Sequence, residues 1–163
     1  MSYDPDRHHR HSTRLRDYDY AQAGVYFLTL CTEGHAQPFG RIANGVVVLT
    51  EIGGTVAEEW ERTPIVRPNI ELDAFIVMPD HLHGIIVIAH RNDESPVATP
   101  TGLRSPAQTV GAIVRGFKAA VVRRVGTPIW LRNYYEHIIR SDADLDRIRQ
   151  YIATNPVRWE ERR

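Results

Sequence analysis

The chain has 163 residues, of which 42% are hydrophobic and 25% are charged, and its formal net charge is zero. This length predicts one domain with a sizeable core, and this composition excludes an intrinsically disordered protein. No apolar run approaches the ~20 residues of a membrane helix and no secretory signal is present. The single cysteine, Cys31, excludes an internal disulfide and fits a reducing, cytoplasmic environment.

The charges are distributed unevenly along the chain. Residues 111–163 contain eleven basic and six acidic side chains, whereas residues 51–94 contain three basic and nine acidic ones. Lys118 is the one lysine among twenty basic residues, and all the others are arginines. Because the planar guanidinium group suits phosphate, the segregation favours nucleic-acid binding by the C-terminal third.

The first half of the chain predicts an arm, a strand, a hairpin and a helix. Residues 1–20 are polar and rich in arginine, which predicts a basic N-terminal arm. The apolar run 24–32 predicts a central strand, and Asn44-Gly45 predicts a tight hairpin turn between two short strands. Residues 50–62 place Ile52, Val56 and Trp60 at intervals of four, which predicts an amphipathic helix that ends before Pro64.

The second half predicts two paired strands, a loop, a helix, a strand and a closing helix. Residues 70–78 and 81–89 are joined by a Pro-Asp turn, and residues 90–105 predict a flexible surface loop. A helix is expected from Ser105 to about Gly126, and a strand over residues 133–140. The closing helix is predicted to begin at Ser141 and to end at Pro156.

Without the small hairpin, this order is strand, helix, strand, strand, helix, strand, helix. It predicts an α+β, ferredoxin-like βαββαβ arrangement with an antiparallel sheet, an inserted hairpin and a C-terminal helix, in a single domain spanning residues 1–163. Helices on one face of such a sheet leave the other face open for a ligand or a second subunit.

The stretch "VMPDHLHGIIVI" places two histidines in the most apolar part of the chain. Strand side chains alternate between faces, so His81 and His83 point the same way. One buried histidine needs no special explanation, but two on one face of a strand suit a shared metal ion, because neutral imidazole is a common metal ligand. The pair therefore indicates a metal site.

Tyr151 and Asn155 are four residues apart and share one face of the closing helix. If this helix packs near the histidine strand, Asn155 can complete a His, His, Asn metal site and Tyr151 can reach the group that the metal polarises. By spacing alone, the tyrosine is more often a packing residue and the asparagine more often a helix stop.

The segments "FIVMPDHLHGIIVI", "YYEHIIR" and "YIATNP" together resemble the IS200-like transposases. These are the single-tyrosine HUH endonucleases, and the resemblance is greatest to the REP-associated tyrosine transposases. The opening "LRDYDYAQAGVYFLTLCT" and the hairpin segment "FGRI" are similar as well, so the resemblance covers nearly the whole chain.

The resemblance implies the chemistry of the site. His81, His83 and Asn155 would hold Mg²⁺ or Mn²⁺, and Tyr151 would attack a phosphodiester in single-stranded DNA. The products would be a 5′-phosphotyrosine link and a free 3′-hydroxyl, and reversal would rejoin strands. Hairpin-bearing DNA ends are the expected partner. Relatives often form homodimers, which makes a homodimer the expected state, but some act as monomers. The sequence decides neither between these states nor whether the tyrosine acts on its own subunit or on the other one.

Further residues receive secondary roles. Asp80 stands where many relatives have asparagine, and it either orients an imidazole or only forms the turn. His137, on the last strand, is more readily structural than part of the site. Phosphate contacts are expected from basic residues of the arm and of the second helix: Arg14, Arg16, Arg115, Lys118 and Arg123.

Two other functions remain open at this stage. A retired member of the family would bind DNA as a regulator without cutting it, although the intact His, His, Tyr, Asn set counts against this. A metal-dependent phosphodiesterase would use water as the nucleophile and leave Tyr151 as a structural residue. A covalent protein–DNA adduct would separate the first hypothesis from both.

Overall fold

The computed structural model describes residues 23–89 and 109–162. The predicted arm, the loop over residues 90–105, the helix start at Ser105, and Arg14 and Arg16 lie outside these ranges. Among the described residues, no helix is long and apolar enough to cross a membrane.

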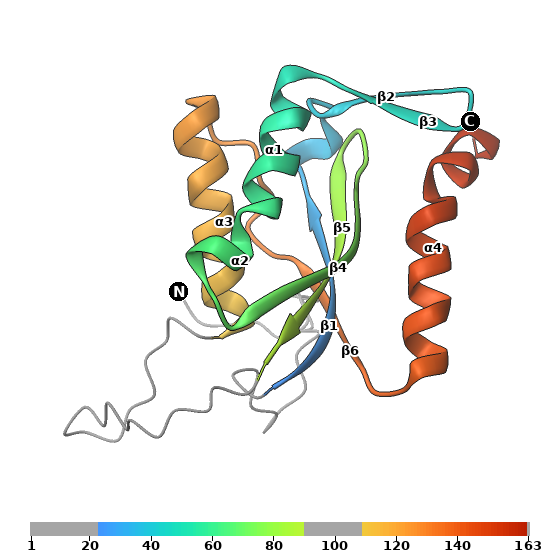
Figure 1. Cartoon of the computed structure of the whole chain (residues 1–163). Coiled ribbons are helices and arrows are strands. Elements are labelled where there is room, and N and C mark those ends of the chain that lie inside the picture. The colour runs from blue at the N-terminus through green and yellow to red at the C-terminus, as the bar shows by residue number, and fades with distance from the viewer. Residues whose placement is uncertain (1–22, 90–108, 163) are drawn as a thin grey trace, which may run out of the picture.

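A four-stranded antiparallel sheet forms the centre of the molecule (Figure 1). Its strands are β1 (Gly24–Cys31), β4 (Ile70–Val77), β5 (His81–Ile88) and β6 (Tyr135–Ile139). The spatial order β4-β5-β1-β6 places the first strand of the chain between β5 and β6, with β4 and β6 at the edges, as in a ferredoxin-like fold. The predicted fold class is confirmed.

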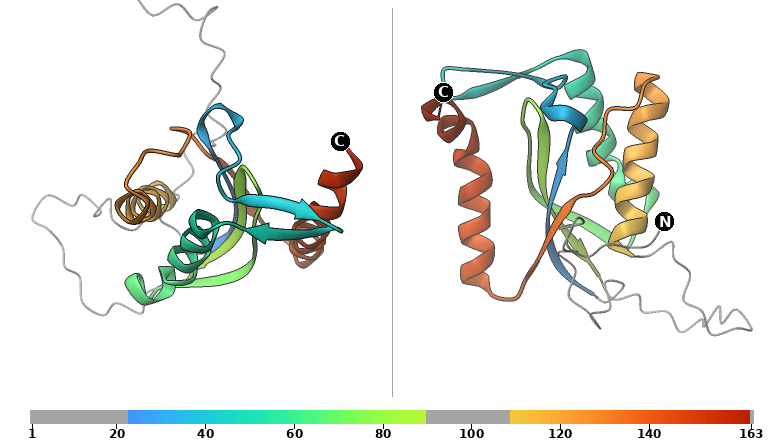
Figure 2. Two further views of the ribbon diagram at one scale, coloured as in Figure 1. Left: turned by 90° about the horizontal axis from the view of Figure 1, so that it is seen from above. Right: turned by 180° about the vertical axis from the view of Figure 1, so that it is seen from behind.

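Helices cover both faces of this sheet (Figures 1 and 2). One face carries α1 (Glu51–Glu61), the short α2 (Thr63–Val66) and α3 (Val110–Val125), and the other carries α4 (Asp142–Glu161). The expectation of an open second face was therefore wrong. A second apolar cluster, made by Phe27, Ile85, Ile139, Ile148 and Ile152, joins α4 to the sheet.

The main core lies between the sheet and the pair α1 and α3. Even-numbered residues of β5, such as Leu82 and Ile86, point into it, whereas odd-numbered ones face α4. Gly84 interrupts the even-numbered row because the Trp60 ring occupies the space of a side chain there: a Cβ atom would lie 2.4 Å from that ring. This close contact allows α1 to pack directly on the strand that carries the histidines.

The remaining elements follow the expected local rules. The hairpin of β2 (Gly40–Ala43) and β3 (Val46–Leu49) turns at Asn44 and Gly45, both with positive φ, and a short 3₁₀ helix, η1 (Glu33–His35), precedes it. Thr109 is extended and caps α3, so this helix begins at Val110 and not at the expected Ser105; Gly126 ends it in the left-handed conformation, as predicted. The Ser141 hydroxyl accepts a hydrogen bond from the Asp144 amide and starts α4, as predicted.

Helix α4 does not end at Pro156 but continues to Glu161. A proline inside a helix removes one amide donor, and contacts elsewhere can compensate for that loss. The Gly45 amide at the hairpin tip donates a 2.7 Å hydrogen bond to the Glu160 carboxylate, and the Trp159 ring lies 5.9 Å from that of His81. These contacts stabilise the last turn, which brings Arg158 and Trp159 to the histidine strand.

Candidate active site

His81 and His83 lie side by side on the face of β5 that α4 covers. Their Nε2 atoms are 3.0 Å apart, and their ring centroids are 4.4 Å apart. His83 is only 5% exposed, while His81 is half-buried. The shared face that the sequence predicts is confirmed by this geometry.

Each imidazole is held by an oxygen on its other nitrogen. The Nδ1 atom of His81 lies 2.5 Å from an Asp80 carboxylate oxygen, and the Nδ1 atom of His83 lies 2.8 Å from the Thr29 hydroxyl. Asp80 therefore contacts the imidazole in addition to forming the turn. Oxygen partners of this kind fix the ring orientation and raise ligand basicity in metal sites.

The electrostatic environment keeps His83 neutral. Burial, and then the nearby His81, lower the pKa of His83 to about 3. A neutral imidazole keeps a lone pair for a metal ion, whereas an imidazolium has none. Cys31 pairs with His81 across the strands, but burial and the Asp80 charge raise the pKa of its thiol, so it stays protonated.

The two imidazoles have a spacing that suits one octahedral cation. Ligand atoms about 2.1 Å from such an ion lie about 3.0 Å apart when they occupy adjacent positions. The observed Nε2 separation is 3.0 Å. In the described part of the chain, no group of three or more His, Cys, Asp or Glu residues could hold a metal. A third ligand from the described residues would therefore be of another kind, such as an amide oxygen.

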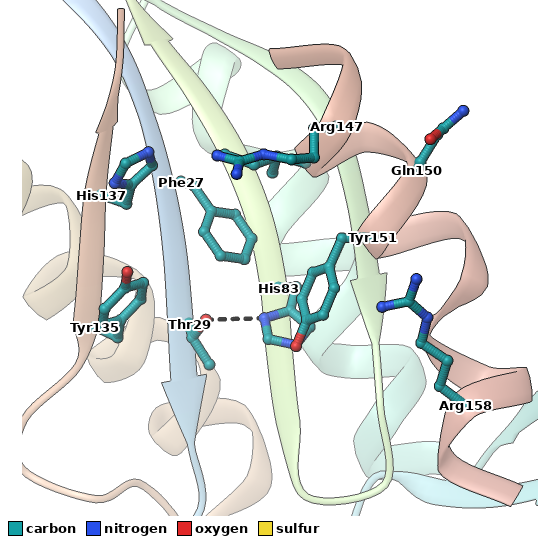
Figure 3. A pocket seen from close by; sticks show the side chains of 10 residues that line it. Phe27, Thr29, His83, Tyr135, His137, Arg147, Gln150, Tyr151 and Arg158 are labelled. Atoms are coloured by element: carbon teal, nitrogen blue, oxygen red, sulfur yellow. Dashed lines mark hydrogen bonds between the residues drawn. The ribbon is translucent and has the colours of Figure 1, made fainter. Parts of the chain in front are cut away.

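Tyr151 extends from α4 to the His83 ring (Figure 3). Its ring lies 5.3 Å from the His83 ring and 6.2 Å, edge on, from the Phe27 ring. The Arg158 guanidinium lies 5.8 Å from the centre of the same ring. The phenol thus has an apolar support, a neutral imidazole and a positive charge around it.

Asn155 lies one turn beyond Tyr151 on the buried side of α4. Its helical neighbours in both directions, Tyr151 and Trp159, contact His83 and His81 respectively, so Asn155 lies between these two contacts. The side chain is 7% exposed. Its amide oxygen is a ligand type that divalent cations accept, so Asn155 fits a third metal ligand.

A cavity of about 770 Å³ opens beside this cluster between β6 and α4. It is lined by residues from the sheet and from α4: Phe27, Thr29, His83, Tyr135, His137, Arg147, Ile148, Gln150, Tyr151 and Arg158. This volume lies within the range of small-molecule and nucleotide pockets. The pocket leads directly to the Tyr151 ring (Figure 3).

His137 lies on the β6 side of this cavity. Its Nε2 atom is 2.8 Å from an Asp144 carboxylate oxygen, and the same carboxylate pairs with Arg147. These two partners hold the pKa of Asp144 below its usual range, with the His137 hydrogen bond as the larger cause. His137 is thus part of the pocket wall rather than of the core.

The basic residues predicted on the second helix lie away from the pocket. Arg115 and Arg123 are exposed on α3, which packs on the other face of the sheet. The Lys118 ammonium donates hydrogen bonds to the carbonyls of Leu131 and Asn133, and burial lowers its pKa. DNA contacts by these three residues stay a prediction.

Several residues of the site were missed by the sequence analysis. Thr29 comes from a strand distant in the sequence, and only the pairing of β1 with β5 places it opposite His83. Arg158 and Trp159 were missed because Pro156 was expected to end the helix. Side chains alternate along β1, which places the odd-numbered residues on the face that α4 covers. This alternation is the one sequence signal that could have identified Thr29.

No family model matches the chain. An "Uncharacterized protein" of Haemophilus influenzae is 40% identical over 170 residues, covering 98% of this chain and 94% of its own length. A "Putative REP-associated tyrosine transposase" of the same organism is 24% identical over 140 residues, covering 86% of this chain and 74% of its own length.

The fold is shared with a solved structure of a REP-associated tyrosine transposase bound to a REP hairpin. The two superpose with a TM-score of 0.62 at 23% identity, over 89% of this chain and 73% of the other. The resemblance in the sequence motifs thus has a counterpart in both sequence and fold. The chain is thus similar in sequence to one REP-associated tyrosine transposase and shares its fold with another.

Proposed function

We propose that the protein is a metal-dependent strand transferase that cuts and rejoins single-stranded DNA with Tyr151 as the nucleophile. The observation that carries this proposal is the position of the Tyr151 ring, 5.3 Å from His83, whose Nε2 atom lies 3.0 Å from that of His81. Neither a structural tyrosine nor a lone buried histidine accounts for both features.

In the proposed reaction, the Tyr151 oxygen attacks the phosphorus of a phosphodiester. Its proton passes to solvent, a bond forms between the phenolic oxygen and phosphorus, and the bond from phosphorus to the 3′ oxygen breaks. The leaving oxygen takes up a proton and becomes a free 3′-hydroxyl, while the 5′ side stays attached as a phosphotyrosine. Because the linkage keeps the energy of the phosphodiester, a 3′-hydroxyl can reverse the step and join strands.

The protein groups around Tyr151 have separate tasks in this step. Phe27 and the second apolar cluster hold the ring in place, and Arg158 offers a positive charge for the phosphate. A divalent cation, Mg²⁺ or Mn²⁺, held by His81, His83 and Asn155 would draw charge from the non-bridging oxygens and align the phosphate. Asp80 and Thr29 would fix the two imidazoles for that task.

Single-stranded DNA with a hairpin is the proposed substrate. The solved relative is bound to a REP hairpin, and this chain shares its fold. Exposed arginines on α3, Arg115 and Arg123, and those of the arm, Arg14 and Arg16, are proposed to contact phosphates. A homodimer also remains a proposal, since a single chain already contains the described parts of the site.

The test is an incubation of the protein with end-labelled single strands from both sides of its own gene, with Mn²⁺ or with EDTA. Denaturing gel electrophoresis then shows whether label migrates with the protein. A Tyr151→Phe variant is the matched control, because it removes only the nucleophilic oxygen.

Each outcome selects one function. An adduct that requires both the metal and Tyr151 supports the proposal. Metal-dependent cutting without an adduct, unchanged in Tyr151→Phe, would indicate a phosphodiesterase that uses water. Specific binding of a strand without any cutting would indicate a DNA-binding regulator.

A further inference from the structure

The pocket extends past Tyr151 to the edge strand of the sheet. The register places Tyr135 of β6 opposite Thr29 of β1, and Thr29 opposite His83 of β5. The three side chains therefore form one row on the face that α4 covers. Two strand spacings, about 10 Å, separate the backbone of Tyr135 from that of His83, a span that one nucleotide can bridge.

Tyr135 has an unusual exposure for a residue on a covered face of the sheet. It is 47% exposed, whereas its neighbour Phe27 is 7% exposed. The Phe27 ring supports it from one side, edge on, at a centroid distance of 6.3 Å. Tyr135 lines the cavity on its β6 side (Figure 3). An exposed aromatic ring with a rigid support is a platform on which an unpaired base can stack.

The far rim of the cavity carries groups that suit a nucleotide. Asp144 holds His137 at 2.8 Å and also pairs with Arg147. The Arg147 side chain is 75% exposed and extends from α4 toward the sheet (Figure 3). Together with Arg158, it gives the cavity two guanidinium groups, and none of the described residues that line the cavity is a carboxylate. The lining therefore combines an aromatic surface with positive charge.

We propose that this part of the pocket binds one unpaired nucleotide next to the phosphate that Tyr151 attacks. Its base stacks on Tyr135 within reach of the His137 ring, and Arg147 pairs with its backbone. This subsite rests on the proposed function, because the attacked phosphate defines its neighbour. A base within a duplex does not offer its flat face to Tyr135, so the subsite selects single-stranded DNA next to the cut.

The test measures binding without cutting. All variants carry Tyr151→Phe, and EDTA is present, so that no strand is broken. A short fluorescein-labelled oligothymidine strand and an abasic strand of the same length are titrated by fluorescence anisotropy against Tyr135→Ala and Tyr135→Phe. Val157→Ala is the matched control, because Val157 is 48% exposed on α4 but does not line the pocket.

Stacking predicts a specific pattern in these titrations. Tyr135→Ala should weaken binding of the oligothymidine at least about fivefold, and Tyr135→Phe should restore it because the ring is kept. Binding of the abasic strand should be the same in all variants, since it has no base to stack. An equal loss on both strands, or no loss on either, would overturn the subsite.

Photo-crosslinking shows where the base lies. A strand with one 5-iododeoxyuridine is irradiated in the complex, and the attached peptide is identified by mass spectrometry. A crosslink at Tyr135 supports the subsite, whereas crosslinks confined to other aromatic residues overturn it. Since neither measurement needs an adduct, a positive result here with no adduct in the cutting assay would reject the tyrosine chemistry alone.

Discussion

The ring of Tyr151 lies 5.3 Å from that of His83 within a single chain. One subunit can therefore supply both the nucleophile and the histidine pair. We predict that mixing a His83→Ala variant with a Tyr151→Phe variant will not restore formation of the covalent adduct. The measurement is the gel assay on equimolar mixtures of the two variants. As a control for mixed assemblies, wild-type protein is mixed with each variant separately.

Restored adduct formation in the mixture would show that α4 of one subunit serves the histidines of another. The ion pair between Asp73 and Arg149, with hydrogen bonds of 2.8 and 2.6 Å, holds α4 on β4 of its own chain, and the Gly45 contact to Glu160 holds it on the β2–β3 hairpin. Such an exchange would have to break all of these contacts.

The hydroxyl of Thr29 is predicted to tune metal binding through His83. Thr29→Val keeps the shape but removes the 2.8 Å contact with the His83 Nδ1 atom. Because outer partners of metal-bound histidines typically contribute 10- to 100-fold in affinity, we expect Mn²⁺ binding to weaken by about that factor. Titration of the free Mn²⁺ signal by electron paramagnetic resonance measures the affinity without any DNA.

Thr29→Ser is the control for this prediction, since it keeps the hydroxyl and should bind Mn²⁺ like the wild type. Equal Mn²⁺ affinity in the valine, serine and wild-type proteins would mean that the contact orients nothing. If none of the three proteins binds Mn²⁺, the proposed metal site itself is rejected.

The sequence predicts the site only as far as local periodicity reaches. Period-two alternation places His81 and His83 on one face, and the four-residue spacing places Tyr151 and Asn155 on another. The contact between these two pairs is tertiary, and it was expected only on condition that the closing helix packs near the strand.

The errors also have physical causes. A proline normally ends a helix because its ring removes a donor and clashes with the preceding turn, yet the contacts of Glu160 and Trp159 stabilise the helix beyond Pro156. Helix α4 packs on the second face because the side chains of Phe27 and Ile85 point toward it. Because these strands are apolar on both faces, the sequence does not indicate which helix covers which face.

The ion pair between Asp73 and Arg149 predicts a dependence of stability on pH. The Arg149 hydrogen bond lowers the pKa of Asp73. The folded state therefore gains from this pair above the unfolded pKa of about 3.9, and the gain is lost as the pH falls through the lower, folded pKa. Asp73→Asn should lower the melting temperature at pH 7 by about 1–3 °C, because partly exposed ion pairs contribute little.

Differential scanning calorimetry from pH 7 down to pH 3 measures this effect. The difference between Asp73→Asn and wild type should shrink at the acidic end. Asp146→Asn is the control, since Asp146 is 73% exposed and contacts the same arginine at 3.3 Å. A difference that grows with acidity would show that the loss in Asp73→Asn has another origin, such as the 2.7 Å hydrogen bond from the Ala74 amide.

Gly84 is predicted to be essential for the close packing of α1 on β5, the strand that carries His81 and His83. A Cβ atom at this position would lie 2.4 Å from the fully buried Trp60 ring, which also packs edge on against Phe117 at 5.2 Å. Gly84→Ala should therefore destabilise the fold by about 1–3 kcal/mol, the usual cost of overpacking a core.

Gly54→Ala is the matched control, because nothing lies within 4 Å of its added Cβ, and the better helix propensity of alanine should stabilise α1 by about 1 kcal/mol. Urea unfolding followed by tryptophan fluorescence measures both, and a stability of Gly84→Ala equal to wild type would show that α1 can shift without loss. Since His83 and Ile85 flank Gly84, a shift of β5 in the variant would also displace the imidazole under Tyr151, so Mn²⁺ affinity should fall together with stability.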